Sequence, residues 1–143
     1  MNDVLILGDG LLGSEIKEVT GWDSISRKKD NIDFNDPSSY IGFLDGYSII
    51  LNCIAYTHTY SEEKMLHWKT NYVSVMSLVE MINNFQQKLI HISTDYIYSG
   101  SKEFASEEDV PVHARNLYSY TKLLGDAYIQ AKCNDYLIIR TSF

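Results

Sequence analysis

Short apolar runs alternate along the chain with longer stretches in which apolar residues recur every three or four positions. Runs of about four to eight apolar residues are typical of buried strands, and the wider spacing is typical of amphipathic helices. The runs predict strands at Val4–Leu7, Asp23–Ser26, Asn31–Phe34, Ser48–Ile54, Lys88–Thr94 and Tyr136–Arg140. The stretches between them predict helices, most clearly at Leu11–Val19, around Met65–Met81 and at Asn116–Ala131.

Strands that alternate with helices predict βαβ units and a parallel sheet covered on both faces. We therefore expect an α/β fold, a Rossmann-like doubly wound parallel sheet in three αβα layers. A chain of 143 residues with 45% hydrophobic content has room for one core, so residues 1–143 should form one domain. No helix and no substrate lobe follow the last predicted strand. The chain is therefore expected to be a fragment, or a minimal domain whose last strand is covered by a partner chain or a second copy.

Three further segments give structural expectations. Asp36-Pro37 has the form of a helix N-cap followed by proline at the first helical position. Ser99–Arg115 is a long polar loop, which predicts either the rim of a ligand site or a surface excursion. The long central helix carries an apolar stripe that should face the core, formed by Met65, Trp68, Val73, Met76, Leu78, Val79 and Met81.

The turn after the first predicted strand has the spacing of a phosphate-binding loop. Gly8, Gly10 and Gly13 form a G-x-G-x-x-G pattern between a strand and a helix. Gly8 permits the tight turn, Gly10 lets a pyrophosphate approach the backbone, and Gly13 lets the helix pack against the sheet. The free N–H groups of the helix that begins at Leu11 and Leu12 would hold the phosphates. The pattern predicts a dinucleotide site, with an ordinary glycine-rich turn as the alternative.

The end of the second predicted strand indicates which nicotinamide cofactor fits. A carboxylate there binds a ribose 2′-hydroxyl, whereas a cation binds a 2′-phosphate. This chain has Ser26, Arg27 and Lys28, then Lys29, and no carboxylate before Asp30. The basic residues favour NADPH, with NADH, or a merely solvated basic loop, as the alternatives. We also assign the following residues Asp33 and Phe34 to the cofactor site.

Four Tyr-x-x-x-Lys pairs occur, and their context selects one candidate for catalysis. The pairs are Tyr60/Lys64, Tyr98/Lys102, Tyr118/Lys122 and Tyr128/Lys132. Of these, Tyr118/Lys122 opens a predicted helix downstream of a strand that ends in Ser93 and Thr94, at the sheet edge where ligands bind. In such a set the tyrosine donates a proton to a ketone oxygen, the threonine hydroxyl stabilises the developing charge, and the ammonium holds a ribose and lowers the tyrosine pKa.

These residues belong to longer blocks that resemble the N-terminal part of the extended short-chain dehydrogenases, and most closely the dTDP-4-dehydrorhamnose reductases. The blocks are Ile6-Leu7-Gly8 with Gly10 and Gly13, Asn52–Thr57, Asn71, His91–Tyr96, Glu107–Asp109 with Pro111, Tyr118–Leu123 and Ile138–Ser142. They cover the whole chain. The resemblance implies an NAD(P)-binding domain, a Thr94, Tyr118 and Lys122 catalytic triad, and a cofactor groove that involves Cys53, Ile54, Ala55, Tyr56, Thr57 and Asn71.

The resemblance also implies a function, the reduction of a 4-keto group on a nucleotide-linked 6-deoxy sugar in dTDP-rhamnose biosynthesis. Tyr96 stands where nucleotide-sugar dehydratases usually have glutamate, which disfavours dehydration. The alternatives are a non-catalytic NADP-binding regulatory subunit and, within the superfamily, an epimerase or dehydratase. Two departures stand out: only Asp9 separates Gly8 from Gly10, where relatives have two residues, and the substrate-binding portion of relatives does not follow.

Composition narrows the remaining classes of partner. The net charge of −7 argues against nucleic acid and anionic membranes, which select basic surfaces. Cys53 and Cys133, without a signal peptide, favour reduced thiols and a cytoplasmic location. By resemblance Glu15 falls near a metal-binding glutamate of some relatives, but the partner ligands are absent and we expect no metal site.

Overall fold

Five strands form a single parallel sheet in the order β2-β1-β3-β4-β5. The strands are β1 (Val4–Leu7), β2 (Asp23–Ile25), β3 (Ile49–Asn52), β4 (Lys88–Thr94) and β5 (Tyr136–Thr141). The structure is a computed structural model that describes residues 3–98, 104–109 and 116–142. Each strand register pairs residues in the same direction, for example Leu7 with Asn52 and Asn52 with His91.

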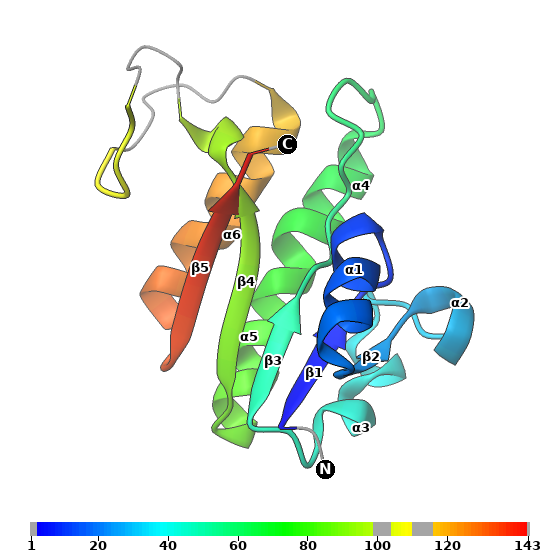
Figure 1. The fold of residues 1–143 in the computed structure, drawn as a ribbon. Helices are drawn as coiled ribbons and strands as arrows, with labels where there is room; N and C mark the ends of the chain where they lie inside the picture. Colours follow the sequence, from blue (N-terminus) through cyan, green and yellow to red (C-terminus); the bar gives the residue numbers. More distant parts are fainter. Residues whose placement is uncertain (1–2, 99–103, 110–115, 143) are drawn as a thin grey trace.

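Helices cover both faces of this sheet. They are α1 (Leu11–Thr20), α2 (Arg27–Asp30), α3 (Ile41–Leu44), α4 (Lys64–Trp68), α5 (Ser74–Phe85) and α6 (Leu117–Lys132), with a π-helical turn at Lys69–Val73 and 3₁₀ turns at Pro37–Ser39 and Asp95–Ile97. Figure 1 shows α1 in front of the sheet, with α5 and α6 behind it. The expected three-layer α/β fold is therefore confirmed.

The core divides between the two faces because successive side chains of a strand point to opposite sides. Leu5 and Leu7 of β1 belong to the larger apolar cluster, together with Val79 and Ile82 of α5 and Ile129 of α6. The alternating residues Val4 and Ile6 belong to a smaller cluster against Ile16 of α1 and Trp22. Near-continuous apolar strands are thus explained by burial on both faces.

The predicted strand at Asn31–Phe34 is wrong. Ile32 and Phe34 are buried, but this segment pairs with no strand of the described chain. The backbone N–H of Asp33 donates to Ser39 Oγ, and the Asp33 carboxylate accepts from the N–H of Asn35. Local side chains thus satisfy backbone groups that a ladder would otherwise pair.

The predicted cap is confirmed, since the Asp36 carboxylate accepts from the Ser38 N–H at the start of the 3₁₀ turn.

The predicted apolar stripe of the long helix is only partly confirmed. Leu78, Val79 and Met81 are buried, but Met65 and Val73 are 62% and 49% exposed. The π-helical turn at Lys69–Val73 explains the difference. A π turn inserts an extra residue into the helix, so one periodic stripe cannot continue from α4 into α5.

The strand β5 keeps one apolar face open. Ile138 packs against the larger core cluster, whereas Leu137 and Ile139 are 47% and 40% exposed. Figure 1 shows α6 behind β5 and no described helix in front of it. Within the described residues, helices therefore cover β5 on one face only.

The close approach of α6 to the π-helical turn generates a stability prediction. A Cβ on Gly125 would lie 2.7 Å from the Asn71 carbonyl oxygen, so Gly125→Ala forces two backbones apart. We expect a loss of about 1–3 kcal/mol in the free energy of unfolding, measured in urea. Gly42→Ala in α3 is the control, because its Cβ would meet no atom within 4 Å. Equal stability of the two variants would contradict the tight contact.

Candidate functional site

The candidate site lies where the sheet changes its direction of growth. From β1 the chain moves to β2 on one side and then crosses to β3 on the other, which leaves a crevice at the carboxyl ends of β1 and β3. A cleft of about 400 Å³ opens there. Its lining comes from the glycine turn, the segments after β3 and β4, the first turns of α6 and the end of β5: Gly10, Leu11, Leu12, Cys53, Ala55, Thr57, Thr59, Ile92, Ser93, Thr94, Asp95, Tyr96, Tyr118, Lys122 and Thr141.

The glycine turn has the geometry that a phosphate-binding loop requires. Gly8 has φ +101°, in the left-handed region that favours glycine, and its N–H donates to the Ile25 carbonyl at 3.0 Å. A Cβ on Gly13 would overlap the Gly8 carbonyl oxygen. A Cβ on Gly10 would meet no atom within 4 Å, and no side chain caps α1 there. The N-terminal N–H groups of α1 therefore face open space, where an anion is favoured.

The basic turn after β2 leaves its cations in solvent. The Asp30 carboxylate accepts from the Ser26 N–H at 2.8 Å, and Ser26 Oγ accepts from the Lys29 N–H at 3.2 Å. Ser26 is buried as the cap of α2 and does not line the cleft, whereas Arg27 and Lys28 are exposed. The one nearby carboxylate of this turn is thus bound to backbone, a detail that sequence reasoning missed.

Two residues assigned to the cofactor site, Asp33 and Phe34, lie outside the cleft lining. Phe34 is 5% exposed and packs edge-on against Tyr40, with ring centroids 5.2 Å apart. Asp33 is exposed and caps a local turn, and the cleft lining includes neither residue. Their assignment to the cofactor site stays a prediction.

Asn71 fixes the segment after β3 without lining the cleft. Its Oδ1 accepts from the Tyr56 N–H at 2.8 Å, and its Nδ2 donates to the Tyr56 carbonyl at 3.1 Å and to Thr121 Oγ1 at 3.3 Å. Ala55 and Thr57, on either side of Tyr56, do line the cleft, and so does Cys53. The Asn71 amide therefore ties the wall of the cleft to α6.

Ile54 and Tyr56 are not among the residues that line the cleft. The N–H of Ile54 donates to Asn52 Oδ1 at 3.0 Å, and its side chain packs against the larger core cluster. The Tyr56 hydroxyl donates to Ser61 Oγ, and its ring packs edge-on against buried His67, 4.8 Å away between centroids. Burial lowers the His67 pKa. His67 also lies against the Tyr118 ring at 6.4 Å between centroids, a neighbour that no sequence motif indicated.

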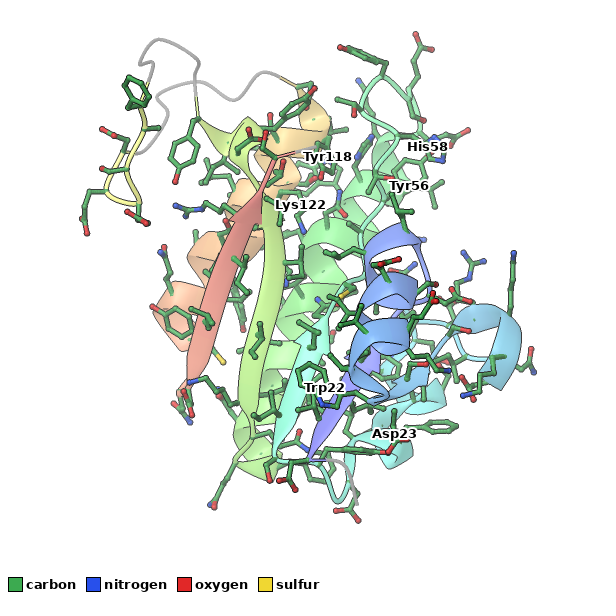
Figure 2. All side chains as sticks on the ribbon, in the orientation of Figure 1. Trp22, Asp23, Tyr56, His58, Tyr118 and Lys122 are labelled. Atoms are coloured by element: carbon green, nitrogen blue, oxygen red, sulfur yellow. The ribbon has the colours of Figure 1, made fainter. Side chains whose placement is uncertain are left out.

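The structure brings Thr94, Tyr118 and Lys122 together in the cleft. Asn116 begins α6 with a capping box to Ser119, which puts Tyr118 in the first turn and Lys122 one turn later. Figure 2 shows both side chains at the carboxyl end of the sheet, with Tyr56 and His58 across from them. Thr94 ends β4, and its Oγ1 accepts from the Tyr96 N–H at 3.2 Å.

Burial controls the ionisation of Tyr118 and Lys122. Burial raises the Tyr118 pKa, while the hydroxyl of Thr94 opposes the rise and nearby acidic groups, Asp95 first, reinforce it. Lys122 is 2% exposed and its Nζ donates to the Ile92 carbonyl at 2.8 Å. Burial lowers its pKa to about 8, against the opposing charge of Asp126. The Tyr118 pKa is thus raised overall, because burial is the largest influence on it. The expected influence of the Lys122 charge on Tyr118 stays a prediction.

Of the other Tyr-x-x-x-Lys pairs, Tyr60/Lys64 and Tyr128/Lys132 do not line the cleft. Tyr60 is 91% exposed, and the Tyr128 hydroxyl donates to Glu80 at 2.8 Å on the surface. Lys102 lies outside the described residues, as does much of the expected rim loop Ser99–Arg115. Selection of Tyr118/Lys122 by context is thus consistent with the described geometry.

Within residues 3–98, 104–109 and 116–142, no three His, Cys, Asp or Glu side chains gather as a metal site would require, and Glu15 is exposed. None of the described helices has the length and apolar character needed to cross a membrane.

A parallel sheet with a glycine turn after β1 and a Tyr-x-x-x-Lys pair at the switch point defines a domain of the short-chain dehydrogenase/reductase class. The chain belongs to the family described as the RmlD substrate binding domain, whose model matches residues 1–143. The resemblance to extended short-chain dehydrogenases of the dTDP-4-dehydrorhamnose reductase type is thereby confirmed.

Individual relatives agree with this family. The chain is 28% identical to the spore coat polysaccharide biosynthesis protein SpsK of Bacillus subtilis, over 100% of this chain and 53% of that protein. It is 31% identical to the dTDP-4-dehydrorhamnose reductase of Salmonella typhimurium over 66% of this chain and 32% of the relative. The chain thus spans about half or less of the length of these relatives.

Solved structures are similar over the same portion. The dTDP-4-dehydrorhamnose reductase of Bacillus anthracis in complex with NADP matches with a TM-score of 0.87 and 26% identity, over 99% of this chain and 54% of that chain. A hypothetical dTDP-4-dehydrorhamnose reductase from Sulfolobus tokodaii matches with a TM-score of 0.86 and 30% identity, over 99% of this chain and 56% of that one.

The clamp formed by Asn71 generates a second stability prediction. Asn71→Ala leaves the N–H and carbonyl of Tyr56 without their side-chain partner, which should cost about 1–3 kcal/mol in the free energy of unfolding. Amide hydrogen exchange at Tyr56 should also become faster. Asn84→Ala, at an exposed position of α5, is the control and should leave both measurements nearly unchanged. Unchanged exchange at Tyr56 in Asn71→Ala would refute the clamp.

Proposed function

We propose that this chain is the NADPH-binding half of a reductase that acts on the 4-keto group of a nucleotide-linked 6-deoxy sugar, the dTDP-4-dehydrorhamnose reductase reaction. The main support is that Thr94, Tyr118 and Lys122 line one cleft together with Gly10 of the glycine turn. The family match over residues 1–143 supports the same reaction class.

The residues of the cleft fit a dinucleotide. The N-terminus of α1 has no side-chain cap, and the space in front of Gly10 is open, so a pyrophosphate can approach the backbone. An ammonium has three N–H donors, and among the described residues Lys122 uses one on the Ile92 carbonyl. Two donors remain for ribose hydroxyls. When bound, NADPH would supply the hydride for the reduction.

The side chains of the cleft would then supply the proton and the charge stabilisation. Because burial raises its pKa, Tyr118 carries its phenolic proton at neutral pH, which is the form needed to protonate a keto oxygen. The hydroxyl of Thr94 would donate a hydrogen bond to the same oxygen as negative charge develops on it. Lys122 would orient the ribose and, as a cation, favour transfer of the Tyr118 proton.

The basic turn supports NADPH over NADH. Arg27 and Lys28 are exposed, whereas the Asp30 carboxylate is occupied by the Ser26 N–H. A 2′-phosphate would therefore meet cations, and a ribose 2′-hydroxyl would lack the carboxylate that NAD sites provide. NADH remains the alternative cofactor.

The exposed surface of this chain indicates what else belongs to the functional assembly. The exposed face of β5 formed by Leu137 and Ile139 needs a cover, which we infer to be a further part of the protein, a partner chain or a second copy of this chain. The open face also favours a second candidate function, a non-catalytic NADP-binding partner subunit. The free thiols Cys53 and Cys133 support a cytoplasmic location.

Replacement of Tyr118 tests the proposed reaction. With NADPH and a dTDP-4-keto-6-deoxy sugar, Tyr118→Phe should reduce kcat by about 10²–10⁴-fold, because the proton donor is lost. NADPH affinity, measured by fluorescence, should change little. The control Tyr120→Phe removes a hydroxyl from a 44% exposed residue of the same helix and should keep wild-type turnover. Wild-type turnover in Tyr118→Phe would contradict the proposed role of Tyr118.

Replacement of the basic residues tests the choice of cofactor. The double variant Arg27→Ala, Lys28→Ala should raise the Kd for NADPH about ten- to hundredfold, because charge-assisted bonds to the 2′-phosphate are lost. The Kd for NADH should stay nearly the same. Lys132→Ala removes an exposed cation at the far end of α6 and serves as the control. An equal rise for both cofactors would show that these cations do not read the 2′-phosphate.

A further inference from the structure

Lys122 carries a charge that its immediate partner does not neutralise. Its side chain is almost fully buried, and the bond from Nζ goes to a neutral carbonyl group, that of Ile92. A buried ammonium is costly without a counter-charge, and burial alone moves the lysine toward its neutral form. The proposed role of Lys122 requires the charged form, so some group must offset burial.

Asp126 is placed to provide that charge. It lies one helical turn after Lys122 on α6, on the same face, and is 0% exposed. Its Oδ2 accepts from Ser93 Oγ at 2.7 Å and from Arg140 Nε at 3.3 Å. The Asp126 charge is the largest influence that raises the Lys122 pKa against burial. In turn, Ser93, Lys122 and Arg140 oppose the rise in the Asp126 pKa that burial causes.

The second oxygen of Asp126 faces a neutral histidine. Oδ1 lies 3.7 Å from His91 Nε2. The Oδ1 of Asn52 accepts from the Ile54 N–H, so its Nδ2 is the group 3.1 Å from His91 Nδ1. His91 Nδ1 must then accept, which leaves the proton on Nε2. Neither Nε2 nor Asp126 Oδ1 has a hydrogen-bond partner among the described residues. Burial, followed by the Lys122 charge, holds the His91 pKa well below its ordinary value.

Two further titratable groups that face this pair, Cys53 and Tyr118, are also neutral near pH 7. Burial raises the pKa of the Cys53 thiol, at the end of β3, to about 11. Burial likewise raises the pKa of Tyr118, on α6. Arg140, from β5, is the second cation at Asp126. Among the described residues packed here, two cations therefore share one carboxylate.

Arg140 extends this arrangement to the segment after β4. Its Nη1 donates to the Tyr98 hydroxyl at 2.9 Å and to the Glu107 carbonyl at 3.4 Å. Its guanidinium carbon also lies 5.5 Å from the centroid of the Tyr98 ring. Arg140, which Asp126 holds at Nε, thus contacts Tyr98 directly before the expected rim loop and Glu107 within it.

We propose that Asp126 is a positioning residue: it is the buried counter-charge that keeps Lys122 an ammonium at the cleft, and it links Lys122 through Arg140 to the segment after β4. The proposal rests on the proposed function only where Lys122 is taken to hold a ribose. The charge relation between Asp126 and Lys122 belongs to the free protein and is measurable without any ligand.

The first experiment measures the charge of Lys122 in the free chain. The Nζ and Cε chemical shifts of Lys122, assigned with Lys122→Arg, are followed by NMR from pH 6 to 11, and the wild-type midpoint is expected at about 8. In Asp126→Asn the midpoint should fall by about 1 unit or more, because the attractive charge is gone. Asp126→Glu should restore most of it. Asp135→Asn, which removes an exposed carboxylate paired with Lys88, is the matched control and should keep the wild-type midpoint.

The second experiment measures NADPH affinity against pH. The wild type should lose affinity as pH rises through about 8, where Lys122 becomes neutral, and Asp126→Asn should lose it at lower pH. A purely structural role would weaken binding equally at every pH and leave the midpoint in place. If Asp126→Asn does not fold, Arg140→Gln tests the same relation with the opposite expected shift. Because Arg140 then no longer competes for the Asp126 carboxylate, the titration midpoint of Lys122 should rise.

The outcomes separate this inference from the proposed function. If the titration midpoint of Lys122 is unshifted in Asp126→Asn, the role of Asp126 is overturned, whether or not NADPH binds. The same holds for Arg140→Gln if that is the variant that folds. A shifted midpoint together with no NADPH binding by the wild type supports the role of Asp126 and overturns the proposed cofactor site.

Discussion

The reversal of strand order between β1 and β3 is the constraint on which the rest of this molecule depends. The chain builds one edge of the sheet with β2, returns, and extends the other edge through β3, β4 and β5. Helices therefore leave the neighbouring strands β1 and β3 on opposite faces, and nothing in the backbone fills the space between their carboxyl ends. The glycine turn, the segment after β3 and the start of α6 all border that space. The cleft is a consequence of topology before any side chain is considered.

Buried polar groups then fix the cleft walls relative to one another. Asn71 joins the segment after β3 to α6, and Asp126 joins α6 to β4 and β5. Both side chains are almost fully buried. Hydrogen bonds in such surroundings are directional and costly to leave unmade, so they define one arrangement of the walls where apolar packing alone would permit several. The tilt of α6, and with it the place of Tyr118, depends on these contacts.

Sequence reasoning predicted the features that depend on local pattern. The parallel strands, the glycine turn and the selection of Tyr118 and Lys122 among four similar pairs follow from periodicity and order along the chain. It failed where side chains compete with the backbone ladder, as at Asp33, and where a π turn shifts the helical phase, as before Val73.

The electrostatics of the site were also beyond the sequence. The direction of the Lys122 amine depends on a carbonyl thirty positions earlier in the chain, Ile92. The capping of Asp30 onto Ser26 likewise depends on the short helix α2, which no apolar periodicity marks. Spacing predicts which groups share a face, but burial and through-space partners decide their charge.

The bare face of β5 has a consequence for the behaviour of the molecule in solution. Leu137 and Ile139 present an apolar strip on the outermost strand of the described sheet, and such strips are the surfaces through which chains associate. Association that buries this strip would stabilise the folded chain by mass action. The melting temperature should then rise with protein concentration. Two stability values for this chain can therefore be compared only when both were measured at the same concentration.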